Sequence, residues 1–366
     1  MNVNTNASKG KIGIVRTFSP GWYASVMGTA VIVIAVFVFK KYVPWPNFWQ
    51  LFFLSLSAVL FLLISTPWFW RWGCCLDAVR EDLQHPVSAA FFPTMPISLV
   101  VWGIALEKAG PLFLPHETVH AIMRVLWVLG GIGIGAFAIT FLSVYFNKTD
   151  LEWHTANLGW LIPPVSVLIL PVLGNSLAVV YAGTVWGDIH FFGSLIALGI
   201  GVLLYIFVAG AVFSRYLFHQ LPPSHLAPTI WIGIAPTAIL EIIIIKMVPA
   251  MQAILGLPDG VTQILSVAAK VAGVSLWGFA FFWLAIAIIV TLLHHHWERL
   301  SFAMSWWAFT FPLGAFVVST GLLNSIFDKL FFRAVGLAGL LGLLAIWAIV
   351  ATTTLRRTIS GEIFRS

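Results

Sequence analysis

Residues 116 to 120 read His-Glu-Thr-Val-His, which is the HExxH pattern found in zinc hydrolases. On a helix the two histidines lie four residues apart on one face, where both can bind zinc while the glutamate activates a water molecule. Asp259 is an acidic residue that could supply a third ligand. One alternative function is therefore an intramembrane zinc metalloprotease that uses His116, Glu117 and His120. The other reading is an ordinary helix start, because Glu117 suits a positive helix N-terminus and so short a pattern arises easily by chance.

Other ionisable residues interrupt long apolar stretches, and such residues are functional candidates by default when they lie in a membrane. They are Arg124, Glu241, Lys246, Lys270 and, at the end of one stretch, His294–His296. Glu241 and Lys246 are five residues apart, on different faces of one helix, so each needs a partner from elsewhere. Structural ion pairing or interfacial placement is the competing interpretation for all of them, and Arg124 and Lys246 are close enough to helix ends to reach the interface. The histidine run could respond to pH or simply mark a membrane boundary.

The composition places these residues in a membrane protein. Of the 366 residues, 60% are hydrophobic and only 9% are charged, whereas a typical soluble domain carries about 25% charged residues. This excludes a secreted disulfide scaffold, a soluble two-domain enzyme and a disordered tail. The net charge of +6 does not indicate nucleic-acid binding, because the basic residues are scattered between apolar runs. Cys74 and Cys75 are adjacent in an expected short polar loop and form no metal or disulfide pattern.

Ten apolar runs are long enough to cross a bilayer, which takes about 20 residues per helix. The expected spans are 20–40, 48–70, 87–106, 118–146, 158–181, 187–214, 228–249, 262–292, 301–323 and 331–355. They predict a transporter-sized domain over 20–355 between terminal segments 1–19 and 356–366. An even number of spans places both termini on one side. Eleven Lys and Arg residues in the segments on that side, against eight elsewhere, favour the cytoplasm and a multi-pass protein of the cell membrane.

The odd-numbered spans resemble one another, since each carries a helix-disturbing residue near its middle. These residues are Gly28, Pro96, Pro171, Pro236 and Pro312, at intervals of 68, 75, 65 and 76 residues. A repeat near 70 residues is the length of one helical hairpin with its loops. The sequence therefore predicts an all-α protein of five tandem hairpins, closed into a ring with the odd helices inside and the even helices outside.

Each proline removes an N–H group and frees a carbonyl oxygen from the helical ladder. Such a break is costly against lipid, so helices with breaks favour positions along a polar path. Proline is also common in membrane helices, where it can simply mark packing. Four of the five odd spans carry no acidic or basic residue in their apolar stretches. These observations favour a central pore lined by backbone dipoles and by small or apolar side chains.

Four blocks of sequence, taken in order, resemble the tellurite-resistance/dicarboxylate transporter family. They are FSPGWYASVMGTA, HPVSAAFFPTMPIS, ANLGWLIPPVSVLILPVLGN and WWAFTFPLGAF. The family includes malic acid transport proteins, TehA-like tellurite-resistance proteins, sulfite efflux pumps and plant slow anion channels. The resemblance covers essentially the whole chain and implies ten helices around a central pore, assembled as a homotrimer.

The resemblance also implies that a phenylalanine of the ninth helix blocks the resting pore. By match to the WWAFTFP block this residue is Phe311, with Phe309 as the fallback. We therefore predict a non-enzymatic transporter of anions, most simply C4-dicarboxylates such as malate, that needs no cofactor. A passive small-anion channel and an exporter of tellurite- or sulfite-type oxyanions remain alternatives. If transport is coupled to protons, Glu241 is the expected proton-binding group.

Overall fold

The computed structural model describes residues 13–148, 155–219, 223–298 and 300–364. Over these residues the chain is helical without strands, and ten helical segments are long and apolar enough to span a membrane. The predicted all-α class and the number of spans are confirmed. The observed spans depart from the expected ones by six residues or fewer at any end, so hydropathy located them well.

The odd-numbered spans share one construction, a short 3-10 helix leading into an α-helix. The pairs are η1 (Pro20–Trp22) with α2 (Tyr23–Val38), η2 (Ala89–Phe91) with α5 (Thr94–Ala109), η5 (Leu158–Leu161) with α7 (Ile162–Val180), η6 (Ala227–Ile234) with α9 (Ala235–Leu255), and η7 (Met304–Phe309) with α11 (Thr310–Phe327). A further 3-10 turn, η3 (Gly110–Leu112), directly follows α5. A 3-10 segment is narrower than an α-helix and is stable only over short lengths.

The even-numbered spans are single long α-helices. They are α3 (Asn47–Cys74), α6 (His116–Phe146), α8 (Val185–Phe218), α10 (Asp259–Glu298) and α12 (Leu330–Ile359). In an apolar 18-residue stretch of each, 17–33% of the residues are buried within the chain, whereas the corresponding stretches of the odd-numbered spans are 44–89% buried. The predicted arrangement of odd helices inside and even helices outside is therefore confirmed, and the exposed apolar faces of the outer helices suit contact with lipid.

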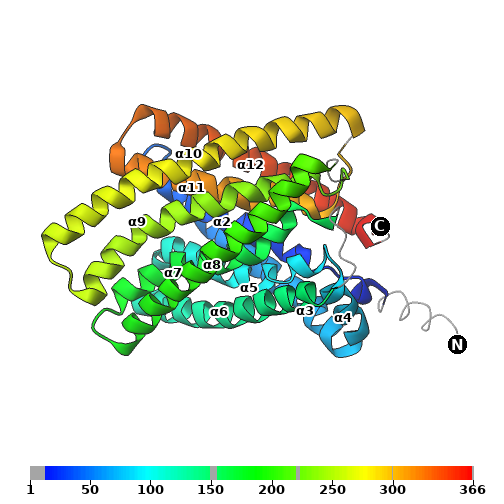
Figure 1. Cartoon of the computed structure of the whole chain (residues 1–366), viewed down its shortest axis with the longest axis horizontal. Helices are drawn as coiled ribbons and strands as arrows, with labels where there is room; N and C mark the ends of the chain where they lie inside the picture. The colour runs from blue at the N-terminus through cyan, green and yellow to red at the C-terminus, as the bar shows by residue number, and fades with distance from the viewer. Residues whose placement is uncertain (1–12, 149–154, 220–222, 299, 365–366) are drawn as a thin grey trace, which may run out of the picture.

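The five inner helices form a closed ring. Packing joins α2 to α5, α5 to α7, α7 to α9 and α9 to α11, and α11 returns to pack on α2 (Figure 1). Gly28 allows this last contact, because a Cβ atom there would lie 2.1 Å from the Thr310 hydroxyl oxygen. At one end Asp328 joins the first and last hairpins, accepting hydrogen bonds from the Tyr42 hydroxyl (3.0 Å) and the Arg333 guanidinium (2.7 Å). The chain thus closes on itself without a partner.

The prolines lie mainly where 3-10 geometry changes to α geometry. Pro96 and Pro312 are the third residues of α5 and α11, and Pro236 is the second residue of α9. Proline is well tolerated there, because the first N–H groups of a helix have no intrahelical acceptor. Pro171 alone of the four lies within its α-helix, and α2 runs uninterrupted through Gly28. The repeated break expected from the prolines is thus supplied mostly by the 3-10 segments.

Two local expectations differ from the structure. The third span is expected to end at residue 106, within about two to four residues, and α5 continues three residues further to Ala109, so it contains Glu107 and Lys108. The segment after the second span is not a polar loop: Cys74 ends α3, and Cys75 links it directly to a short helix, α4 (Leu76–Gln84). Both differences have one cause, because charged residues at a helix end lower the hydropathy without ending the helix.

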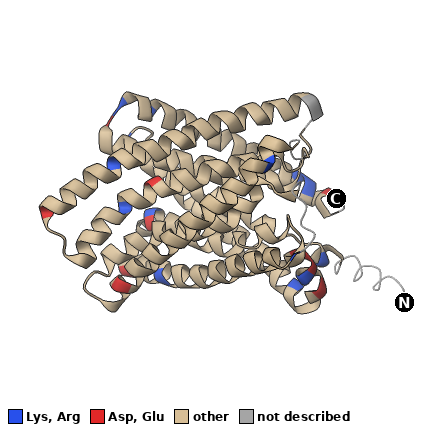
Figure 2. Cartoon of the chain, in the orientation of Figure 1, with Lys and Arg blue, Asp and Glu red and all other residues tan. Residues whose placement is uncertain are grey.

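Both ends of the described chain lie at the same side of the ring (Figure 1), as an even number of spans requires. Lys, Arg, Asp and Glu gather toward the two ends of the helices, with few along their middles (Figure 2). Residues 1–12 and 365–366 of the expected terminal segments lie outside the described residues. At the terminal side Arg71 is buried and donates hydrogen bonds to the carbonyl oxygens of Arg16 (2.8 Å) and Phe18 (3.1 Å), which ties the start of the chain to α3.

Candidate anion path

Side chains from all five inner helices meet inside the ring in four layers. On every inner helix the contributing positions are separated by three, four and three residues, the spacing that keeps one helical face turned inward. The layers are Ala24, Thr94, Ile162, Ile232 and Ala308; Met27, Ile97, Val165, Ala235 and Phe311; Val31, Val101, Ile169, Ile239 and Ala315; and Ile34, Ile104, Val172, Ile242 and Val318. Corresponding residues of successive hairpins are 70, 68, 70 and 76 residues apart.

This register differs from the one that the prolines suggest. Pro312 follows the second-layer residue Phe311 by one position, but Pro171 follows the second-layer residue Val165 by six. The inward face of each helix, and not the position of its proline, is what repeats. The position of the proline can vary, because the change from 3-10 to α geometry does not require proline at one fixed residue. The inward positions cannot vary in this way, because their side chains must pack against one another.

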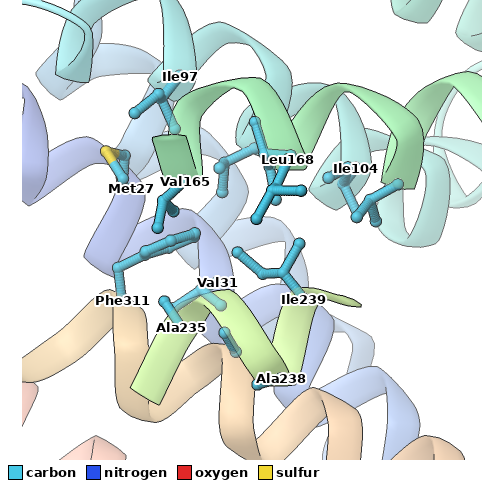
Figure 3. Close-up of a cluster of buried hydrophobic side chains, with 14 of the residues drawn as sticks. Met27, Val31, Ile97, Ile104, Val165, Leu168, Ala235, Ala238, Ile239 and Phe311 are labelled. Carbon is cyan, nitrogen blue, oxygen red and sulfur yellow. The ribbon is translucent and has the colours of Figure 1, made fainter. Parts of the chain in front are cut away.

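Phe311 lies between two small cavities inside the ring. The cavity at the 3-10 side has a volume of about 50 Å³, and the one beyond Phe311 has about 30 Å³. Phe311 is the one described residue that lines both, and it is 6% exposed. Figure 3 shows its ring reaching from α11 toward Val165 on α7, with Met27 and Ala235 beside it. Cavities of this size have room for no more than a few water molecules, so the path is closed to a hydrated anion.

The lining of both cavities is almost wholly apolar and contains no charged side chain among the described residues. Its hydroxyl groups lie at the 3-10 side and are engaged: Thr94 donates to the carbonyl oxygens of Pro20 (2.8 Å) and Phe91 (2.6 Å), and Ser305 donates to that of His225 (2.5 Å). A path of this kind cannot hold an anion by charge. Its apolar lining is typical of a hydrophobic constriction, which excludes ions because water does not fill it.

The opposite end of the ring carries charge. Lys246 on α9 donates a hydrogen bond to the carbonyl oxygen of Val172, a fourth-layer residue, at 3.1 Å. Its ammonium nitrogen lies 3.7 Å from one carboxylate oxygen of Glu107, whose other oxygen lies 2.8 Å from the Lys108 ammonium. Lys246 and Glu107 border a cavity of about 310 Å³ that is also lined by His120 and Asn175. Lys246 therefore finds its partner on another helix, as its spacing from Glu241 predicts.

Glu241 has a different environment. Its side chain is fully buried, and neither carboxylate oxygen has a partner within hydrogen-bond distance among the described residues, although the unpaired Ser319 hydroxyl of α11 lies close by. It faces the outer helix α10, since a Cβ atom at Gly273 would lie 3.3 Å from the Glu241 Cγ. Glu241 lines neither axial cavity. A buried carboxyl without partners is costly to keep charged, which favours its neutral form.

The HExxH residues lie away from the axis on the outer helix α6. His116 and Glu117 are exposed, and the two imidazole rings are 6.1 Å apart between centroids. Across the described ranges no group of three or more His, Cys, Asp or Glu side chains is placed to hold a metal ion. The third ligand that the metalloprotease alternative requires, including Asp259, is thus not brought to the two histidines.

The remaining singled-out residues are also outside the axial path. The Arg124 guanidinium stacks over the rings of Tyr181 (5.3 Å) and Trp186 (4.8 Å), an arrangement suited to the edge of a membrane. The imidazole Nδ1 of His294 lies 3.0 Å from the carbonyl oxygen of Val290 on its own helix. Lys270 lies on α10 and is half-buried.

Within the described residues, ten apolar spans arranged as a ring of five hairpins define the class of this protein as a multi-pass membrane protein built around a closed axis. Comparison with known proteins makes this specific. Residues 17–355 match the family model described as voltage-dependent anion channel (SLAC1), and the chain belongs to this family, which unites the channels and transporters that its four sequence blocks resemble.

Individual relatives span the same range of transport proteins. The chain is 31% identical to an uncharacterized transporter of Methanocaldococcus jannaschii over 98% of its own length and 99% of that protein. It is 22% identical to a sulfite efflux pump of Trichophyton rubrum, over 96% of this chain and 93% of the pump. An S-type anion channel of Arabidopsis thaliana is 22% identical over 72% of this chain and 44% of the channel.

Proposed function

We propose that this protein carries small anions across a membrane along the ring axis, with C4-dicarboxylates such as malate as its substrates and Phe311 as the gate. The observation that carries the proposal is the position of Phe311, whose ring alone lines both axial cavities among the described residues. Movement of this ring would join the two cavities without disturbing the backbone. An apolar lining without fixed charges lets an anion leave again, which rapid transport requires.

The earlier fallback for the gate, Phe309, is less suitable. Its ring packs edge-on against Trp231 at 5.2 Å between centroids, and it does not line either cavity. Removing Phe309 would create a hole in the packing between η6 and η7, not an opening along the axis.

The test is anion flux through Phe311→Ala in proteoliposomes, with malate, sulfite, nitrate and chloride compared in turn. We expect flux to rise on the order of a hundredfold, which corresponds to about 3 kcal/mol of barrier. Phe316→Ala is the matched control, because Phe316 is equally buried on α11 but stacks on Trp277 and lines neither cavity. Equal flux in Phe311→Ala and Phe316→Ala at equal protein incorporation would reject Phe311 as the gate.

The same experiment separates the substrates. Flux that favours malate supports the dicarboxylate assignment, and flux that favours chloride and nitrate supports a passive small-anion channel. A preference for sulfite would support an oxyanion exporter, which the 22% identity to the sulfite efflux pump over 96% of the chain makes the second candidate. Failure of every anion to pass in Phe311→Ala would reject anion transport along this axis.

We further propose that Glu241 binds the coupled proton if transport depends on pH. Support comes from its complete burial and from its two unpartnered carboxylate oxygens within the described part of α9 and its neighbours. Glu241→Gln keeps the shape and removes the acid, so malate uptake should lose its dependence on pH. Glu117→Gln, at an exposed position, is the control. Retained pH dependence in Glu241→Gln would remove Glu241 from the mechanism.

The proposal includes a homotrimer with one path per subunit. Because one chain forms the whole ring and its lining, each subunit should conduct by itself. The mass of the complex in detergent, measured by light scattering, tests the assembly. Mixing wild-type and Phe311→Ala chains should then give flux proportional to the fraction of variant chains, whereas a path shared between subunits would give a curved dependence.

A further inference from the structure

The three-four spacing of the inner helices continues past the fourth layer. Four residues beyond it, the corresponding positions are Val38, Lys108, Ser176, Lys246 and Leu322. Two of these five are lysines, and Ser176 and Lys246 line the cavity of about 310 Å³ at this end. The end of the ring opposite the 3-10 segments thus has a sizeable cavity, lined by α5, α7, α9 and the outer helix α6, together with positive charge. We call this end the charged mouth.

This cavity offers hydrogen-bond donors that the chain does not use. Asn175 is 2% exposed, lines the cavity and has no partner for its amide nitrogen among the described residues. The Lys246 ammonium has three N–H groups, one of which is donated to Val172. Its separation of 3.7 Å from Glu107 is an ion pair but exceeds hydrogen-bond length. A buried donor left unpaired costs free energy, so the site is stabilised by an acceptor brought from outside.

The charge around this cavity determines which kind of hydrogen-bond acceptor it can bind. The two lysines and Glu107 leave a net charge of +1 at the mouth, so a small anion is attracted while a cation is not. Oxygen atoms suit both the ammonium and the amide donor. The Glu107 carboxylate already places such an oxygen near Lys246, so it occupies the position that a free oxyanion would take.

We propose that the cavity bounded by Lys246, Asn175 and Glu107 is an entry site for a small oxyanion, a carboxylate or a sulfite, and that Glu107 is a built-in counter-ion which the oxyanion displaces from Lys246. The inference rests on the proposed anion transport and names its entry site. The competing anionic side chain keeps the affinity low, which allows the bound oxyanion to move on toward the axial path.

Binding can be tested without transport by thermal unfolding of the purified full-length protein in detergent, titrated with sodium sulfite or sodium malate. A ligand that binds the folded state raises the unfolding temperature in proportion to its saturation. Lys246→Gln should weaken oxyanion binding about tenfold, as expected for loss of a charged hydrogen-bond donor. Glu107→Gln should strengthen binding about tenfold by removing the competing charge.

Two further variants keep the test sharp. Lys270→Gln, a lysine on the adjacent helix α10 that does not line the cavity, should bind as the wild type does. Lys246→Arg should retain binding if the charge is what matters. Because Glu107→Gln predicts a gain, loss of stability in Lys246→Gln cannot by itself produce the expected pattern.

Equal anion dependence in wild type, Lys246→Gln and Glu107→Gln would overturn the entry site, as would a uniform absence of any anion-dependent shift. Flux through Phe311→Ala separates this result from the proposed function. Flux together with binding that does not depend on Lys246 rejects the entry site and keeps the transport proposal. Binding that depends on Lys246 without flux in Phe311→Ala keeps the site and rejects transport along the axis.

Discussion

The two ends of the ring differ in width and in charge. At the 3-10 side the path narrows to the Phe311 ring and its lining is uncharged. At the other end Lys246 and Glu107 line a cavity of about 310 Å³, and Lys108 pairs with Glu107. If anions follow this axis, as we propose, the difference teaches that exclusion and attraction of the anion take place at separate points. An ion held by charge at the narrowest point would bind too tightly to leave, so charge is useful at a wide mouth and apolar packing at the constriction.

The largest expected effect concerns the constriction itself. If the second layer closes the path by volume, the double variant Phe311→Ala/Ala235→Phe should close it again, because both residues belong to that layer and total volume is kept. We expect flux to fall on the order of tenfold or more below that of Phe311→Ala. Flux measured in proteoliposomes checks this, and a double variant as open as Phe311→Ala would mean that closure needs Phe311 in particular.

A second prediction concerns the close packing that supports the closed end. Gly28→Ala should destabilise the fold by about 1–3 kcal/mol, because the new Cβ atom would lie 2.1 Å from the Thr310 hydroxyl oxygen at the start of α11. Gly135→Ala on the outer helix α6 meets open space and should stabilise by about 0.5–1 kcal/mol. Opposite shifts in the unfolding midpoint are expected. Equal shifts would show that the inner ring tolerates change as the outer ring does.

The third prediction concerns the charged mouth. Raising the ionic strength from about 0.01 M to about 0.15 M shortens the Debye length from about 30 Å to about 8 Å. Oxyanion binding at Lys246 should therefore weaken about threefold, and the dependence should be smaller in Lys246→Gln. Closure by Phe311 involves no charge, so the ratio of flux in Phe311→Ala to that in wild type should not change. A salt-dependent ratio would indicate that the two ends are coupled.

The smallest expected effects involve exposed carboxylates at the two ends. Hydrogen bonds from Tyr42 and then Arg333 lower the pKa of Asp328, which lies between α11 and α12, and the hydrogen bond from Arg16 lowers the pKa of Asp77 at the terminal side. A carboxyl whose pKa is lower in the folded chain stabilises the fold above its unfolded value of about 3.9 and loses that contribution as the pH falls below it.

Asp328→Asn and Asp77→Asn should therefore reduce the unfolding temperature slightly at neutral pH and lose their difference from wild type in acid. Unfolding curves recorded between neutral pH and about pH 3 would check this. A difference from wild type that grows in acid would contradict the sign of both shifts.

Much of the architecture could be predicted from the sequence, because lipid permits few solutions. Apolar runs of sufficient length located the ten spans, and a repeat near 70 residues indicated the hairpins. The register inside the ring could not be predicted from prolines, since Pro171 stands six residues after its layer residue and Pro312 one. Phe311 was selected by family resemblance alone, because nothing in the chemistry of one phenylalanine among 30 distinguishes it.

Glu107 was missed for a related reason. Hydropathy ended the third span at residue 106, although α5 continues to Ala109. The ion pair with Lys246 joins residues 139 positions apart, on helices that no local pattern relates. The sequence indicated this ion pair in one respect: Glu241 and Lys246 lie on different faces of one helix, so Lys246 needs a partner from elsewhere.

The sequence by itself determined that this chain crosses a membrane ten times in five similar hairpins. Backbone groups in lipid must form their hydrogen bonds within helices, and the length of each apolar run can be read from consecutive residues. Tertiary structure decided which helical face turns inward, which phenylalanine separates the two axial cavities, and which carboxylate meets Lys246. Those choices depend on how closely five helices approach one another around the axis. Contacts such as Gly28 against Thr310 set that approach, and they exist only once the ring is closed.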